Sequence, residues 1–347
     1  MVRISDIIRD EDLFKTTAVK SNRIAISEIL AADDIIGNQI SPGLRAPTTQ
    51  EEQDAKSMLN GLYTALAKAH TLVREGKRFA VEPFGILAEK FINTLDRYDN
   101  IYMLAEYGDY DGTDYIRNSL WTALISAKIG RRLGLERKEL GELILCCFFH
   151  DIGTGHLNNG VLAKPGELTG AEREEIQKHP VFGREILLSL GESHRYISDA
   201  AFQEHERMDG SGYPTGLGGE GIGLYARIIG LADTYEAMTH TRPYHARKLP
   251  LFVVKEIVEK MRGKFDTKVI KALLEEVTMF PVGSFVRLNN REVGRVIAAI
   301  KGAHFRHVVQ ILFGPDGMRL IKPKTINLME AHLLYITEPV DERDLGQ

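Results

Sequence analysis

The sequence has little cysteine: Cys146 and Cys147 are its only two, and they are neighbours. Two adjacent thiols build no disulfide framework, because successive side chains on a helix point in different directions. Both lie in the apolar run 143–149, which favours buried free thiols. Free thiols in turn favour a reducing compartment, so we expect the protein in the cytoplasm.

A membrane segment and an excess of one charge are also missing. No stretch approaches the roughly 20 apolar residues of a membrane span, and Met1 to Asp6 lacks the apolar core of a signal peptide. Lysine and arginine number 44 against 48 aspartates and glutamates, which gives a net charge of -4. A general DNA-binding role is therefore not expected, because it needs a basic surface.

The 347 residues are enough for two or three domains, and the pattern changes twice along them. Thr48 and Thr49 before two glutamates predict a helix start, followed by leucines at helical spacing. No chemistry is evident in this first region. We predict three parts: an N-terminal helical regulatory or dimerising region over 1–97, a helical domain over 98–279 that carries the chemistry, and a small β domain over 280–347.

The middle part is predicted to be an array of helices. Expected helices run from about Arg117 to Leu133, from about Lys138 to Phe149, from a capping box at Thr169, through Ile197 to Ala201, and from about Leu224. Pro180 is expected to interrupt the helix that Thr169 opens, directly after His179. The segment from Met208 to Gly223 is a glycine-rich loop.

After residue 280 the runs become short and rich in β-branched residues. We expect strands at Ser284–Leu288, Glu292–Ile297, Val308–Phe313 and Leu333–Ile336, with turns at Asn289-Asn290 and 314–317. These strands predict a small β-barrel or β-sandwich of about 60 residues. The fold class is therefore mainly α, with a β-barrel-like module at the C-terminus.

Five potential metal ligands recur between the apolar helical segments: His150, Asp151, His179, His205 and Asp233. Each stands at a helix end, at a helix break or among small residues, where a side chain can reach a shared point. Imidazole together with carboxylate suits iron, manganese or zinc. Two such cations about 4 Å apart can activate a water and hold a phosphoryl oxygen. The pattern therefore predicts a metal centre.

The motifs around these ligands resemble those of the HD-GYP family, a branch of the HD-domain metal-dependent phosphohydrolases. They are His150-Asp-Ile-Gly153, Lys164-Pro-Gly-Glu-Leu-Thr169, His179-Pro180, His205-Glu-Arg-Met-Asp-Gly-Ser-Gly-Tyr-Pro214 and Asp233-Thr-Tyr-Glu-Ala-Met-Thr239 before Arg242-Pro-Tyr244. The resemblance covers roughly residues 100–275. It implies a helical bundle that hydrolyses cyclic di-GMP to pGpG and often to GMP, with two or three divalent ions, usually iron or manganese. The C-terminal β module also resembles one that some members carry.

The resemblance also implies a role for each matching residue. His150 and Asp151 fall on the catalytic metal-binding pair, with Asp151 bridging two ions, and His179, His205 and Asp233 fall on further ligands. The signature Gly212, Tyr213 and Pro214 forms a lip beside the site, which has been linked to protein partners such as GGDEF-domain proteins. Arg242 falls where the substrate phosphate is contacted, a task that suits a guanidinium, and Tyr213 is a second candidate for substrate binding.

Four positions depart from the family pattern. Asn118 replaces the first histidine, and an amide is a poorer ligand for iron or zinc than an imidazole; Asp114, one turn earlier, falls where some members carry a ligand for a third metal. Glu204 stands where the first of two adjacent histidines is usual, and it can still ligate. Thr154 replaces a lysine that would neutralise substrate phosphate. His245 lies in a region that is often basic.

These residues predict two ion sites, and the second has more strong ligand candidates than the first. The first would use His150, Asp151 and Asp233 with Asn118; the second would use Asp151, His179, Glu204 and His205.

Three hypotheses follow for the function: a phosphodiesterase for cyclic di-GMP, a catalytically weak module that acts as a receptor for the nucleotide or a protein partner, and a hydrolase for another cyclic dinucleotide or a nucleotide monophosphate. A homodimer is compatible with all three, through the N-terminal helices.

Overall fold

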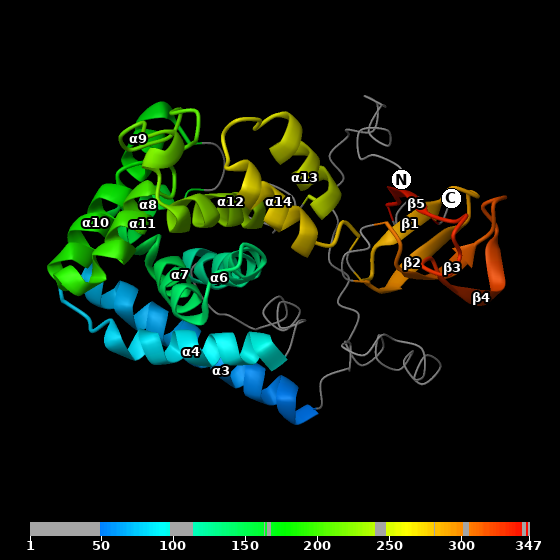
Figure 1. The fold of residues 1–347 in the computed structure, drawn as a ribbon, viewed down its shortest axis with the longest axis horizontal. Helices are drawn as coiled ribbons and strands as arrows, with labels where there is room; N and C mark the ends of the chain where they lie inside the picture. The colour runs from blue at the N-terminus through cyan, green and yellow to red at the C-terminus, as the bar shows by residue number, and fades with distance from the viewer. Residues whose placement is uncertain are drawn as a thin grey trace.

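The computed structural model of the protein describes residues 49–97, 114–162, 164, 168–239, 248–280, 282–300, 305–341 and 345. The described residues up to 280 form a helical body, and those after it form a small sheet (Figure 1). The mainly α fold with a C-terminal β module is therefore confirmed. None of the described helices is both long enough and apolar enough to cross a bilayer.

The first two described helices are α3 (Thr49–Arg74) and α4 (Glu82–Arg97). The expected helix is confirmed over Thr49–Arg74, and Thr49 is the first described residue. Leucines at helical spacing on α3, among them Leu59, Leu62 and Leu66, are completely buried. The two helices run along one side of the helical body (Figure 1). Helix α4 packs on α7 (Arg137–Phe149), and α3 packs on α6 (Asp114–Arg132) and on the 3-10 helix η3 (Ile152–His156). This packing brings α3 to the loop that follows His150 and Asp151, two of the predicted metal ligands.

The helices of the middle part follow in sequence order. They are α6 (Asp114–Arg132), α7 (Arg137–Phe149), η3 (Ile152–His156), α8 (Asn159–Leu162), α9 (Gly170–Ile176), α10 (His179–Ser189), η4 (Glu192–His194), α11 (Arg195–Gln203), η5 (Gly219–Gly221), α12 (Leu224–Thr239), α13 (Pro250–Glu259) and α14 (Thr267–Glu276). Helix α6 packs against α3, α7, α12 and α14, so it is the central helix of the body.

The expected capping box forms at the start of α9. The Thr169 hydroxyl accepts a hydrogen bond from the Glu172 amide at 3.3 Å, and the Glu172 carboxylate accepts one from the Thr169 amide at 2.7 Å. A helix break near Pro180 is confirmed, but it comes before His179 and not after it. Helix α9 ends at Ile176 and a new helix begins at His179, with Pro180 in its first turn, where the missing N–H costs nothing.

The C-terminal module is a five-stranded antiparallel sheet in the order β4-β3-β2-β1-β5. Its strands are β1 (Phe285–Leu288), β2 (Val293–Ala298), β3 (Val308–Phe313), β4 (Arg319–Asn327) and β5 (Ile336–Pro339). The first three match the expected strands. The expectation of a strand over Leu333–Ile336 was wrong for its first three residues, because Ile336 is the first residue that pairs with β1, opposite Leu288.

Strand β4 was missed altogether by sequence reasoning. It lies at one edge of the described sheet and pairs only with β3 there. Most of its residues are exposed, and it contains Pro323 between Lys322 and Lys324. An edge strand tolerates proline and charge because one of its sides needs no partner strand. The usual signal of alternating apolar residues is therefore absent from its sequence.

Candidate metal centre

Helix α7 delivers the first two ligand candidates at its C-terminal end. His150 caps the helix and is completely buried, and Asp151 follows as the residue before η3. The His150 Nδ1 lies 2.8 Å from the Cys147 carbonyl. A carbonyl only accepts, so Nδ1 carries the hydrogen and Nε2 faces the site. That Nε2 is 3.3 Å from the Asp151 Oδ2, so the end of the helix aims both side chains at one region.

His179 is arranged in the same way at the start of α10. Its Nδ1 donates to the Ile176 carbonyl at 2.8 Å, which again leaves Nε2 facing inward. That Nε2 lies 3.4 Å from the Asp151 Oδ1 and 3.3 Å from the Glu204 Oε1. The two oxygens of Asp151 therefore face two different imidazoles, His150 on one side and His179 on the other. A carboxylate so placed is suited to bridge two cations.

Glu204 and His205 follow α11 and complete the group. The Glu204 side chain is almost fully buried, at 1% exposure, and the His205 Nε2 lies 3.1 Å from the His179 Nε2. One ligand atom each from Asp151, His179, Glu204 and His205 lies within 4.8 Å of the other three. We call these four residues the ligand cluster. Imidazole nitrogens and carboxylate oxygens at this spacing form a donor set for a divalent cation.

Buried atoms without a hydrogen-bond partner near the ligand cluster indicate whether a cation fits there. Among the described residues, the buried His150 Nε2 and Glu204 Oε2 have no hydrogen-bond partner, and they are 3.7 Å apart. Burying an unpaired polar atom costs about 1–3 kcal/mol. Divalent cations bound at the centre would accept both lone pairs and remove that cost. The residues present therefore fit a metal ion.

The ionisation of the cluster is set by burial and by opposing charges. Burial acts to lower the pKa of His150, but the charges of Glu204 and Asp151 outweigh it and raise that pKa well above its usual range. Burial acts to raise the pKa of Asp151, yet the His150 charge lowers it. Burial raises the pKa of Glu204 and lowers that of His205. Without a metal, a proton on His150 balances the carboxylates; a bound cation would replace it.

The other side of the centre is held by an amide. The Asn118 Nδ2 donates to the Asp233 Oδ1 at 2.8 Å and to the Glu236 Oε2 at 2.6 Å. Asp233 lies outside the ligand cluster. Sequence reasoning assigned no role to Glu236, which is buried one turn after Asp233 on α12. The i, i+3 spacing of two acids on a buried helix face was the signal that could have revealed it.

Thr154 and Gly153 shape the loop after Asp151. The Thr154 hydroxyl is buried and donates to the Asp151 carbonyl at 2.7 Å. Thr154 thus stabilises the turn and does not present a cation, as a lysine would. A Cβ at Gly153 would lie 2.0 Å from the His179 carbonyl oxygen. Only glycine permits this approach of α10, which places His179 opposite Asp151.

The glycine-rich loop packs its tyrosine on the cluster. The Tyr213 ring stacks on the His205 ring, with centroids 4.7 Å apart and an interplanar angle of 19°. The Tyr213 amide donates to the His205 carbonyl at 3.2 Å. A Cβ at Gly212 would lie 2.4 Å from the Glu206 Cα, so this position also requires glycine. The signature Gly212-Tyr213-Pro214 therefore orients His205, because its tyrosine packs directly on the His205 ring.

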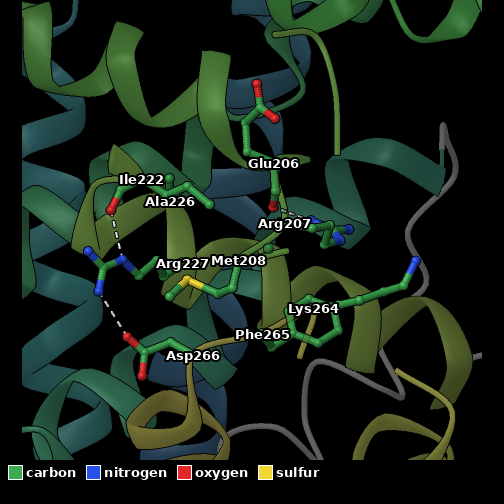
Figure 2. Close-up of a pocket in the computed structure, with 10 residues that line it drawn as sticks. Glu206, Arg207, Met208, Ile222, Ala226, Arg227, Lys264, Phe265 and Asp266 are labelled. Atoms are coloured by element: carbon green, nitrogen blue, oxygen red, sulfur yellow. Dashed lines mark hydrogen bonds and ion pairs between the residues drawn. The ribbon is translucent and has the colours of Figure 1, made fainter. Parts of the chain in front are cut away.

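A small pocket lies where the same loop meets the turn before α14 (Figure 2). Arg207 donates to the carbonyls of Glu204 and Glu206 at 3.0 and 2.9 Å, and its guanidinium lies 4.9 Å from the Phe265 ring centroid. Arg227 bonds Asp266 at 2.9 Å on the other side. The two Arg207 hydrogen bonds anchor the backbone on both sides of His205.

Three of the predicted site residues cannot be placed in this way. Arg242 and His245 fall in 240–247, outside the described residues. Asp114 is the first residue of α6, but its side chain is outside what the structure describes. The roles of Arg242 in substrate binding and of Asp114 in a third metal site stay predictions.

Comparison with known proteins finds two family models that match this chain. A family model described as "HD domain" matches residues 89–269, more than half of the chain, and one described as "KOW domain associated with HD domain" matches residues 285–347. A cyclic di-GMP phosphodiesterase of Pseudomonas aeruginosa, PA4108, is 34% identical over 221 residues, which are 64% of this chain and 53% of that protein. RpfG of Xanthomonas campestris, a cyclic di-GMP phosphodiesterase response regulator, is 36% identical over 154 residues, 43% of this chain and 40% of that one.

A third relative and one solved structure complete the comparison. The 3'3'-cGAMP-specific phosphodiesterase 1 of Vibrio cholerae is 33% identical over 178 residues, 50% of this chain and 40% of that protein. This chain thus spans about half the length, or less, of these curated relatives. The structure of Bd1817, an HD-GYP-type protein from Bdellovibrio bacteriovorus, aligns with a TM-score of 0.53 at 16% identity over 72% of this chain and 78% of that one, a likeness of fold alone. The chain belongs to the HD-domain family, in its HD-GYP branch.

Proposed function

We propose that the protein is a metal-dependent phosphodiesterase that hydrolyses a cyclic dinucleotide, with cyclic di-GMP as the first candidate and pGpG or GMP as product. The observation that carries the proposal is the ligand cluster, with the two oxygens of Asp151 facing two imidazoles. The names of the relatives support the substrate class, because they include phosphodiesterases for cyclic di-GMP and for 3'3'-cGAMP.

Each residue has a role in this proposal. Two divalent ions, iron or manganese in our prediction, would supply an activated water and a Lewis acid for the phosphoryl oxygen when bound. Asp151 would hold both ions. One ion would also be bound by His179, Glu204 and His205, and the other by His150 and Asp233. The hydrogen bonds from the Nδ1 atoms to backbone carbonyls keep the Nε2 atoms turned inward.

Further predictions concern substrate and partners. Arg242 would contact a phosphate, and Tyr213, fixed beside His205, would border the bound nucleotide. The loop 212–214 is the predicted contact for a protein partner such as a GGDEF-domain protein. We also keep the division into 1–97, 98–279 and 280–347 and the homodimer as predictions.

A nucleotide receptor is the second candidate function. Asn118 favours it, because its amide bonds both Asp233 and Glu236 where the family pattern has a metal-binding histidine. Thr154 favours it too, since its hydroxyl turns inward to the Asp151 carbonyl. Such a centre would bind an ion at the ligand cluster and bind the nucleotide, yet hydrolyse it slowly.

The deciding experiment uses anaerobically purified protein. Its metal content is determined, and samples loaded with iron or manganese are incubated with cyclic di-GMP and, side by side, with 3'3'-cGAMP. We expect a linear product on chromatography that disappears with chelator and in Asp151→Asn. His156→Ala is the matched control, because His156 is exposed on η3. Bound metal and bound nucleotide without product would establish the receptor instead.

A further inference from the structure

One buried histidine lies outside the family match and makes no hydrogen bond through its ring to any described residue. His70, on helix α3, is only 2% exposed, and among the described residues neither of its ring nitrogens has a hydrogen-bond partner. Leaving a buried polar group unpaired costs about 1–3 kcal/mol, so such a group calls for an explanation. An apolar residue at this position of the α3 core face would avoid the cost.

One side of His70 is fixed by the loop after Asp151. Val73 lies one turn further along α3, on the same face as His70. A Cβ built at Gly155 of η3 would lie 2.9 Å from the Val73 Cγ1. The α3 face that carries His70 therefore packs directly on η3, the element that begins after Asp151.

The other side of His70 is fixed by α6. The His70 ring lies 4.7 Å from the Tyr115 ring, centroid to centroid, and Arg74 donates to the Tyr115 hydroxyl at 2.9 Å. Tyr115 precedes Asn118 by three residues on the same helix, so both lie on one face. His70 is thus bracketed by the Asp151 loop and by the helix face where Asn118 replaces a histidine.

The charges that act on His70 agree with this position. Burial lowers its pKa to about 4, the Asp151 carboxylate opposes that shift, and Arg74 and His150 add to it. These charges agree with the packing of the α3 face on η3, directly after Asp151. At neutral pH the imidazole is uncharged and keeps a lone pair, which is the form that binds a metal ion.

We propose that His70 is a further imidazole of the metal centre, binding a divalent cation on the Asn118 side together with His150 and Asp151. It would supply from α3 the kind of ligand that α6 lacks at position 118. Helix α3 would then be part of the active centre, although it precedes the family match at residues 89–269. The inference rests on the metal centre of the proposed function.

The test compares metal binding by His70→Leu and the unchanged protein, both stripped with chelator and titrated with Mn²⁺ alone. Leucine keeps the apolar volume and removes the unpaired nitrogens, so the metal-free variant should be at least as heat-stable as the original. We expect its Mn²⁺ affinity to fall by at least about tenfold for one ion, with the ion at the ligand cluster retained. His156→Ala, an exposed histidine on η3, should bind as the original does.

A second variant keeps the test decisive if leucine disturbs folding. His70→Ala leaves a space that free imidazole can enter, and added imidazole should restore the lost Mn²⁺ affinity in this variant only. Unchanged Mn²⁺ stoichiometry and affinity in His70→Leu, with loss in Asp151→Asn, would overturn the role of His70 and leave the proposed function intact. Failure of the unchanged protein to bind Mn²⁺ or Fe²⁺ would instead overturn the metal centre itself.

Discussion

The two sides of the metal centre are built differently, although one loop serves both. In the ligand cluster, imidazoles and carboxylates converge, and the Glu204 Oε2 has no hydrogen-bond partner within the described part of the chain. On the other side, the Asn118 amide donates to both Asp233 and Glu236. The ligand cluster offers two imidazoles and two carboxylates, whereas both carboxylates on the other side already accept hydrogen bonds from an amide, and the Asn118 Oδ1 there, unpaired among the described residues, is a weaker metal ligand than an imidazole. We therefore expect the ligand cluster to bind its ion more tightly than the amide side.

The largest effect is expected at Asp151, the residue that joins the two sides. Asp151→Asn removes the charge between His150 and His179, so both proposed ions would lose a charged ligand. Metal-ion stabilisation of the transition state is worth several kcal/mol, so turnover should fall by about 1000-fold. Product formation and metal content are measured together. Retained activity with retained metal would show that the two sides do not depend on a shared carboxylate.

An acid-dependent loss of stability is expected from His70, on the amide side. In chelator-treated protein, folding lowers its pKa from 6.5 to about 4, chiefly through burial. Between those values the unfolded chain binds a proton that the folded chain does not, so stability falls as the pH drops from about 6.5 towards 4. The full difference corresponds to roughly 3 kcal/mol. Urea unfolding of the original and His70→Leu at pH 7 and pH 4.5 measures it, and parallel pH dependence in the two would contradict it.

A gain of metal affinity is expected from Asn118→His. The substitution replaces an amide donor by an imidazole beside Asp233, so the amide side should bind its ion about tenfold more tightly. Titration with Mn²⁺ should show the weaker site strengthening while the ligand cluster is unchanged. Asn118→Ala is the control, because it frees Asp233 without adding a ligand. Equal gains in the two variants would mean that the amide acts only by blocking Asp233.

The smallest effect is expected at Tyr213. Its ring stacks on His205, and phenylalanine would preserve that stacking. Tyr213→Phe should therefore change metal affinity by less than about twofold, whereas Tyr213→Ala should weaken the ion at the ligand cluster by about tenfold. A raised KM in Tyr213→Phe with unchanged metal affinity would place the hydroxyl against the substrate.

Local patterns predicted much of the fold. The helix ending at His150, the capping box at Thr169 and three strands of the C-terminal sheet are where the spacing of apolar and capping residues put them. Strand β4 and the correct start of β5 were not predicted, because an edge strand need not alternate apolar and polar residues. The four residues of the ligand cluster were also grouped correctly as neighbours in space, while their binding of metal stays a prediction.

His70 and Glu236 show where sequence reasoning stopped. A single histidine on the apolar face of α3 cannot be told from an ordinary core histidine until its neighbours are known, and the N-terminal helices had suggested no chemistry. Glu236 stood inside a recognised motif without a role until its bond to Asn118 was seen. Both depend on residues more than 40 positions away in the chain.

The sequence by itself determined which donors are present, their order, and the glycines and caps that allow each local turn. These are properties of short segments, where spacing and residue type are sufficient. Only the tertiary structure decided which ring nitrogens face the centre, that the Asn118 amide binds two carboxylates, and that α3 brings His70 to the Asp151 loop. These depend on the packing of helices distant in sequence, which no local pattern specifies.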